Sequence, residues 1–177
     1  SKRVNPLAAS VGSNLTLECD VANDADLDLV FAKIKHTWGH LDFVVHAIAY
    51  SDKNELKGRY ADTTRQNFLE TMDISCFSFT NVARRATALM GTGGSLITLS
   101  YLGSVRTIPN HNVMGVAKAA LEASVRYLAA DLGPRGIRVN ALSPGPMRTL
   151  AGSAIADARY VYRYSENNSP LARNIEN

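Results

Sequence analysis

The sequence has 177 residues, 46% of them hydrophobic, a size and composition that predict one globular domain over 1–177. Its formal net charge of +3 is small and dispersed, so we expect no nucleic-acid partner. The longer apolar patterns are amphipathic, and no apolar signal segment follows the residues Ser1 to Val4, so we expect neither a membrane span nor a signal peptide.

Strand and helix patterns alternate along the chain. In order, they predict a strand over 15–21, a helix over 25–38, a strand over 41–49, a long helix over 65–89, a strand over 95–100, a helix over 112–132 and a strand over 136–143. Apolar strands separated by helices predict an α/β fold, a doubly wound, Rossmann-like parallel sheet with helices on both faces. Such a sheet binds its ligand at the carboxyl ends of the strands.

Cysteines and histidines carry weaker signals. Cys19 and Cys76 lie far apart without partner spacing, which indicates free, buried thiols and a reducing, cytoplasmic setting. His46 lies within an apolar strand pattern, which favours a hydrogen-bonded core histidine over a catalytic one. The sequence shows no cluster of His, Cys, Asp or Glu with metal-ligand spacing, so we predict no metal.

The most informative segment is 100–118, where Tyr101 and His111 precede Lys118 in a predicted strand, loop and helix. Lys118 follows His111 by seven residues, which places both on one helix face about two turns apart. A lysine in this position can bind the ribose hydroxyls of a nicotinamide nucleotide. Its charge also favours proton donation by a neighbouring phenol or imidazole. The segment therefore predicts a redox site.

Several short motifs resemble one family. They are SYLG at 100–103, IPN at 108–110, NVMG at 112–115, NA at 140–141 and GPMRTL at 145–150, with CDV at 19–21, HAIA at 46–49 and MDIS at 72–75. Together they resemble the enoyl-[acyl-carrier-protein] reductases of bacterial type II fatty-acid synthesis, a divergent branch of the short-chain dehydrogenase/reductase superfamily. The resemblance covers nearly the whole chain.

The resemblance implies reduction of the trans-2 double bond of an enoyl thioester by NADH, with NADPH not excluded. The implied partners are an acyl-carrier protein and further copies of the chain, as a tetramer. Catalytic roles fall on Tyr101, His111 and Lys118, and substrate contacts on Ser51, Tyr101 and His111. The implied cofactor-binding residues are Asp20, Val21, Ala47, Ile48, Ala49, Lys118, Gly145, Pro146, Met147, Arg148, Thr149, Leu150 and Ala151.

Some of these residues also have ordinary structural readings. Asp20 ends a predicted strand, where a carboxylate commonly caps the next helix. Ala47, Ile48 and Ala49 also suit the interior of a core strand. The segment 144–165 resembles the family's mobile substrate loop, and its tyrosines suit packing against a lipophilic ligand or a neighbouring subunit.

His111 departs from the family, which has a second tyrosine at this position. Three readings follow: Tyr101 serves as the proton donor, His111 has taken that role, or the site is impaired. An imidazole loses its proton near neutrality, whereas a phenol keeps its proton to about pH 10. An ordinary ketoacyl or alcohol dehydrogenase and a non-catalytic nucleotide-binding relative remain alternative functions.

A phosphate-binding glycine-rich turn after a first strand is not found in the sequence. The glycine run at 91–94 leaves a predicted helix and enters a strand, so it is not a helix N-terminus that could hold pyrophosphate. Set against the family, the sequence is expected to lack the first β-α-β unit and the last helix and strand. The sheet is therefore expected to be incomplete at both ends.

Overall fold

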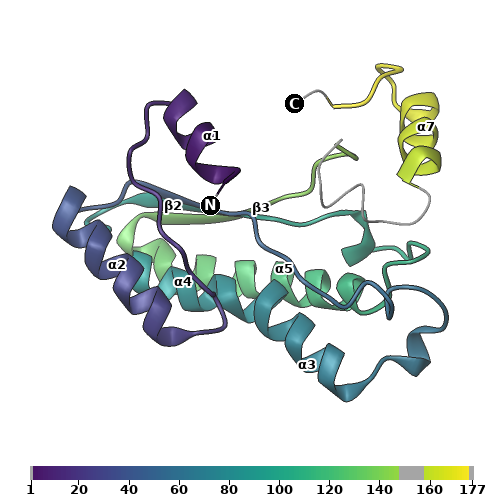
Figure 1. Ribbon diagram of the computed structural model, residues 1–177, viewed down its shortest axis with the longest axis horizontal. Helices are drawn as coiled ribbons and strands as arrows, with labels where there is room; N and C mark the ends of the chain where they lie inside the picture. The colour runs from purple at the N-terminus through teal and green to yellow at the C-terminus, as the bar shows by residue number, and fades with distance from the viewer. Residues whose placement is uncertain (1, 148–157, 176–177) are drawn as a thin grey trace.

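The computed structural model describes residues 2–147 and 158–175 (Figure 1). The elements are α1 (Val4–Ser10), α2 (Asp24–Trp38), β1 (Phe43–His46), the 3-10 turn η1 (Tyr60–Asp62), α3 (Arg65–Met72), the π-helical turn η2 (Asp73–Phe77), α4 (Ser78–Ala86), β2 (Gly94–Leu99), the 3-10 turn η3 (Leu102–Ser104), α5 (Asn112–Leu132), the 3-10 turn η4 (Gly133–Arg135), β3 (Ile137–Leu142) and α7 (Ala158–Asn168).

The three described strands form a parallel sheet in the order β1-β2-β3. Val44, Leu96 and Val139 are aligned across it, and they point toward the helices because successive side chains alternate between the faces of a sheet. Phe79 of α4 and Leu121 of α5 complete this core and are fully buried. The predicted α/β, Rossmann-like fold class is confirmed.

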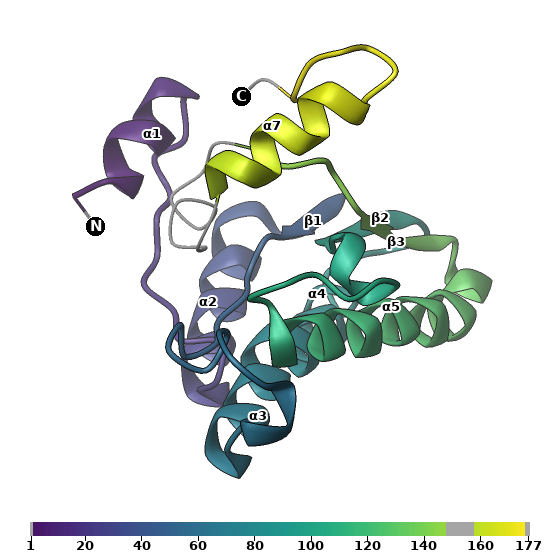
Figure 2. The same cartoon turned by 90° about the vertical axis from the view of Figure 1, so that its right-hand side faces the viewer.

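The helices that contribute to the buried core gather on one face of the sheet. Figures 1 and 2 show α2, α4 and α5 on this face, with α1 and α7 on the opposite side. Side chains that point to that opposite side are largely solvent-accessible, since Phe43 is 64% exposed and Val45 is 56% exposed. The sequence predicted helices packed on both faces of the sheet. Among the described residues, close packing is seen on one face only.

The helix predicted over 65–89 is continuous through α3, η2 and α4 but ends at Ala86 and contains a π-helical turn. Ser75 lies in this turn and is fully buried. Its hydroxyl donates to the Tyr50 carbonyl and accepts from the Tyr50 N–H, both at 2.9 Å. The π-helical turn thus places the Ser75 side chain where it holds the backbone of Tyr50, in the segment that follows β1.

The predicted strand over 15–21 is wrong. This segment has no regular structure, because a strand requires a hydrogen-bonded neighbour and no described strand pairs with it. Cys19, expected to be buried, is exposed as a consequence, whereas Cys76 is buried as expected. The predicted strand over 41–49 is also shorter, since pairing ends at His46.

His46 is a satisfied core histidine, as predicted, and is only 2% exposed. Its Nε2 lies 2.8 Å from the Ser78 hydroxyl, and its Nδ1 lies 3.0 Å from the Thr98 hydroxyl. Because the Ser78 hydroxyl donates to the Ile74 carbonyl, it accepts from Nε2–H. The Thr98 hydroxyl then donates to Nδ1 at 3.0 Å, the shorter of its two contacts, the other being the His46 carbonyl at 3.3 Å. Burial, followed by the charge of Lys118, lowers the pKa of His46 to about 4.

We predict that the protein loses stability as the pH falls from about 6.5 to 4 because of His46. The unfolded state binds the proton in this range and the folded state does not, so the loss approaches about 3 kcal/mol near pH 4. Urea unfolding at pH 7, 5.5 and 4 measures it. His46→Gln should show a weaker pH dependence than the wild type, whereas His36→Gln, at an exposed site on α2, should match the wild type.

Candidate active site

Lys118 lies on α5 with its ammonium group beneath the carboxyl ends of two strands. Its Nζ donates to the carbonyl of Leu99, the last residue of β2, at 2.8 Å, and to the carbonyl of Ile48, just after β1, at 3.4 Å. The side chain is 6% exposed, and burial lowers its pKa to about 8. Lys118 thus remains charged at neutral pH but is easily neutralised above it.

Tyr101 follows β2 by two residues and begins the turn η3. Its hydroxyl oxygen is buried without a hydrogen-bond partner among the described residues. Burial raises the pKa of Tyr101 to about 12. The phenol therefore keeps its proton through the physiological range, and its O–H has no acceptor among the described residues.

The histidine that departs from the family contacts this tyrosine directly. The rings of Tyr101 and His111 are 5.1 Å apart between centroids and tilted by 31°. His111 is the residue preceding α5, and its Nδ1 lies 2.9 Å from the Pro109 carbonyl. A carbonyl can only accept, so Nδ1 carries a proton. In a neutral imidazole Nε2 is then an acceptor, and His111 can donate through Nε2 only when it is protonated.

Residues after β1 lie at the same edge of the sheet, because the strands are parallel. Ala47 and Ala49 are exposed, and Ile48 is half-buried with its carbonyl bound to Lys118. Ser51 lies further along, and its hydroxyl accepts from Thr71 at 2.9 Å and donates to Asn67 at 3.2 Å. The binding roles expected for these residues stay predictions. A substrate that binds the Ser51 hydroxyl would compete with its hydrogen bonds to Asn67 and Thr71 of α3.

Asp20 and Val21 lie in the turn that leads into α2. The Asp20 carboxylate accepts from the Ala22 N–H at 3.0 Å, and the Asp20 N–H donates to Asp26 at 2.9 Å. These bonds stabilise the turn before the helix, although the helix cap itself is Asn23. The adenine-binding role expected for this pair stays a prediction.

The segment after β3 is held by the C-terminal residues. Tyr162 of α7 donates to the Met147 carbonyl at 2.8 Å, and Asn174 donates to the Tyr162 carbonyl at 3.0 Å. A Cβ atom at Gly145 would lie 3.2 Å from the Ile175 side chain. Gly145, Pro146 and Met147 are among the described residues, whereas Arg148, Thr149, Leu150 and Ala151 lie outside them. The expected loop over 144–165 is described only at its two ends.

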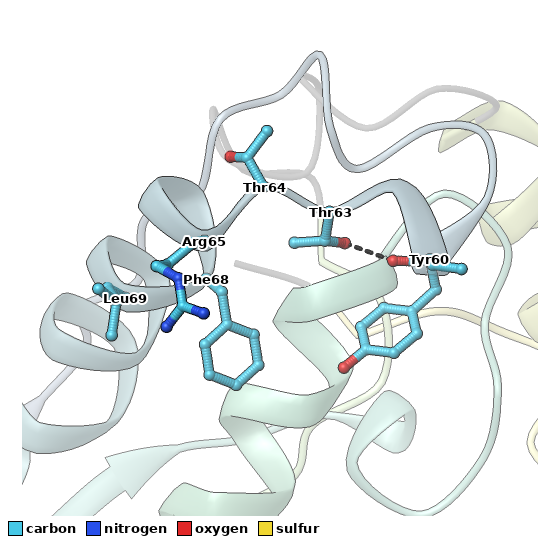
Figure 3. A pocket seen from close by; sticks show the side chains of 7 residues that line it. Tyr60, Thr63, Thr64, Arg65, Phe68 and Leu69 are labelled. Carbon is cyan, nitrogen blue, oxygen red and sulfur yellow. Dashed lines mark hydrogen bonds between the residues drawn. The ribbon is translucent and has the colours of Figure 1, made fainter.

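A pocket of about 420 Å³ lies elsewhere, beside the start of α3 (Figure 3). Tyr60 and Phe68 line it with their rings, and the Arg65 side chain lies between α3 and the Phe68 ring. It is lined by none of the predicted site residues. The pocket is thus separate from the candidate active site.

The sequence analysis missed two residues that shape the site. Glu122 of α5 accepts hydrogen bonds from Ser100 and Ser104, which flank Tyr101. Asn112, at φ 30°, donates to the carbonyls of Glu55, Lys57 and Gly58 and so ties the loop after β1 to the start of α5. The spacing of Glu122, four residues after Lys118, was the available signal, because it places both on one helix face.

Comparison with known proteins places this site in a family. The sequence model described as "Enoyl-(Acyl carrier protein) reductase" matches residues 1–177. The chain belongs to this family. A relative named enoyl-[acyl-carrier-protein] reductase [NADH] 2, from Rhizobium meliloti (strain 1021), is 64% identical over 174 residues, which cover 98% of this chain and 65% of the relative.

Solved structures of the family have the same fold. FabI from Candidatus Liberibacter asiaticus is 52% identical with a TM-score of 0.95, covering 99% of this chain and 68% of that one. The Anaplasma phagocytophilum reductase, solved in complex with NAD, is 58% identical with a TM-score of 0.93, covering 98% and 66%. The chain spans 65% and 64% of the lengths of the two Rhizobium meliloti reductases that it matches.

Two further observations concern the described part of the chain alone. None of its helices is both long and apolar enough to cross a bilayer. It also contains no group of three or more His, Cys, Asp or Glu side chains arranged to hold a metal ion.

We predict that Gly115→Ala destabilises the protein, although alanine normally favours a helix by about 1 kcal/mol. A Cβ atom at Gly115 would lie 2.9 Å from the backbone oxygen of Gly103, so η3 must shift away from α5. We expect a net loss of about 1–3 kcal/mol in the free energy of unfolding, measured with urea.

Gly91→Ala is the matched control for this substitution. A Cβ atom at Gly91 meets no atom within 4 Å, so we expect a change of no more than about 0.5 kcal/mol. Equal stability of the wild type and Gly115→Ala would show that the contact between η3 and α5 is not tight.

Proposed function

We propose that the protein reduces the trans-2 double bond of enoyl-acyl-carrier-protein thioesters with NADH in type II fatty-acid synthesis. Family membership and the names of the relatives support this activity. The observation that carries it is the buried hydroxyl of Tyr101, which has no partner in the described part of the chain and lies at the same edge of the sheet as the buried cation Lys118. A reductase needs such a donor where negative charge develops on the substrate oxygen.

The chain's own residues fit a nicotinamide nucleotide at this edge. Lys118 offers an ammonium group whose present partners are backbone carbonyls, and such a group can also bind ribose hydroxyls. Ala47 and Ala49 are small and exposed, which lets a flat ligand approach the chain after β1 closely. The dinucleotide, when bound, supplies a hydride for the β-carbon of the enoyl thioester.

Tyr101 is the proposed donor to the thioester oxygen. Its raised pKa keeps the phenol protonated, so it can stabilise the enolate oxygen by hydrogen bonding at any physiological pH. Lys118 adds positive potential as long as it is charged, which holds below about pH 8. His111 is less suited to this role, because its Nδ1 is engaged by Pro109 and its Nε2 donates only in the imidazolium form.

We predict that Tyr101→Phe lowers kcat by on the order of 100-fold, the usual effect of losing a hydrogen bond to a developing oxyanion. His111→Tyr should change kcat only modestly. The rates are measured with NADH and a crotonyl thioester on the whole protein between pH 6 and 9.

Other outcomes of this experiment would contradict the assignment. If Tyr101→Phe has no effect on the rate, Tyr101 is not the donor, and the role falls to His111. If the wild type binds NADH but is nearly inactive, and His111→Tyr restores the rate, the histidine impairs the site.

We predict that Lys118→Met weakens NADH binding by on the order of 100-fold, because charge-assisted hydrogen bonds to the ribose are lost. Wild-type affinity should also fall as pH rises through about 8, where Lys118 loses its proton, and the variant should show no such dependence. Calorimetric titration at pH 7 and 9 measures both effects. Lys35→Met, at an exposed site on α2, is the matched control, and an unchanged affinity in Lys118→Met would refute the role.

The proposed partners follow from the proposed activity. The substrate is carried by an acyl-carrier protein in the cytoplasm, and the segment 144–165 serves as a mobile substrate loop. A homotetramer is supported by large apolar side chains on the outer surfaces of the long helices. Leu69, Phe77 and Tyr127 are 57%, 55% and 77% exposed, respectively, and point away from the sheet core.

A further inference from the structure

One face of α5 holds the chain segment that carries Tyr101. Gly115, Lys118 and Glu122 are spaced by three and four residues and therefore share a helix face. Lys118 binds the Leu99 carbonyl, Gly115 lies directly against the Gly103 carbonyl, and Glu122 binds the two serines of the same segment. Lys118 thus contacts the chain before the Tyr101 turn, Gly115 contacts the turn itself, and Glu122 contacts the serines on both sides of Tyr101.

Glu122 makes the most specific of these contacts. Its Oε1 lies 2.5 Å from the hydroxyl of Ser100 and 2.5 Å from the hydroxyl of Ser104. Distances this short are typical of hydroxyls that donate to a carboxylate, the stronger class of hydrogen bond. Ser100 precedes Tyr101 and Ser104 follows it by three residues, so one carboxylate oxygen fixes both sides of the tyrosine.

Other hydrogen bonds of this segment lie within the turn, including one at 2.9 Å from the Ser104 hydroxyl to the Tyr101 carbonyl. The Ser104 N–H donates to the Tyr101 carbonyl and the Val105 N–H to the Leu102 carbonyl, both at 3.1 Å. These bonds are internal to the turn and maintain its shape. Ser100 is only 5% exposed, so without an acceptor its hydroxyl would have to find another partner in a buried place.

The phenol ring moves with the turn because it is packed against it. A Cβ atom at Gly103 would lie 2.2 Å from the tyrosine ring, and a Cβ atom at Gly115 would lie 3.6 Å from the hydroxyl. The ring therefore occupies the space between η3 and α5. A shift of η3 along α5 would displace the hydroxyl by a similar amount.

We propose that Glu122 is a positioning residue that sets the location of the Tyr101 hydroxyl through Ser100 and Ser104. The effect of Glu122 on catalysis rests on the proposed function. Its effect on the position of the Tyr101 ring does not. A displacement of about 1 Å in a catalytic group can lower the rate by on the order of 100-fold. Glu122 thus acts on the reaction without contacting the substrate.

The first test is a kinetic comparison in the whole protein with NADH and a crotonyl thioester. We expect Glu122→Ala to lower kcat roughly 10- to 100-fold with the KM for NADH unchanged. Glu122→Gln keeps an acceptor oxygen and should recover part of the loss, and Ser104→Ala should lower kcat less than Glu122→Ala. Asp131→Ala, at an exposed acidic site on the same helix, should match the wild type.

The second test reads the tyrosine itself and does not depend on turnover. The ring carbon bearing the hydroxyl is labelled with ¹³C in all tyrosines, and Tyr101→Phe identifies the Tyr101 signal in the NMR spectrum. In the wild type this phenol should titrate at about pH 12, and Glu122→Ala and Ser104→Ala should shift its pKa toward the ordinary value of about 10 as the ring becomes exposed.

The outcomes separate the two proposals. An inactive wild type whose Tyr101 signal still shifts in Glu122→Ala contradicts the proposed function and supports the positioning role. An unchanged kcat and an unchanged Tyr101 titration in Ser104→Ala overturn the positioning role, even if Glu122→Ala does not fold.

Discussion

The buried ammonium group of Lys118 is the interaction on which the site depends. It binds the backbone at the ends of two parallel strands, through the Leu99 carbonyl after β2 and the Ile48 carbonyl after β1. The pairing of β1 with β2 ends at His46 and Thr98, just before these positions, whereas Leu99 is still aligned with Leu142 of β3. One side chain from the core helix thereby fixes the relative position of the two segments that carry the site residues.

Burying this cation costs free energy, and it lowers the pKa values of both Lys118 and the neighbouring His46. Desolvation lowers the pKa of Lys118 to about 8, and the same positive charge contributes to the low pKa of His46. His46 is neutral at neutral pH, and each of its ring nitrogens is hydrogen-bonded to a hydroxyl group. Lys118 and His46 are thus buried but hydrogen-bonded, which is the condition under which buried polar groups are tolerated.

Helix α5 packs closely against the backbone of η3 and contacts most of the segments that carry the candidate site residues. The helix meets η3 at Gly115 with no room for a side chain, and the same face presents Lys118 and Glu122 four residues apart. The start of the helix is equally constrained, because Asn112 binds the loop after β1 and His111 packs on the Tyr101 ring. His111 thus places an imidazole, where the family has a second tyrosine, directly against the Tyr101 ring.

The sequence by itself determined α2, α5 and most of the sheet, whereas α1 and α7 were not among the predicted elements. The 3.6-residue pattern gave α5 its bounds, and the continuous apolar runs identified β1, β2 and β3, since these features depend on local periodicity. It also singled out Tyr101, His111 and Lys118, whose spacing is carried on one strand, loop and helix. His46 was likewise recognised as a core residue from its apolar neighbours.

Only the tertiary structure decided how these residues are partnered. The strand predicted over 15–21 failed because strand formation needs a neighbour that local sequence does not reveal. The π-helical turn, the unpartnered Tyr101 hydroxyl and the carboxylate of Glu122 between two serines depend on contacts between segments distant in sequence. Periodicity fixes which face a residue occupies, but only the packed chain brings a donor to its acceptor.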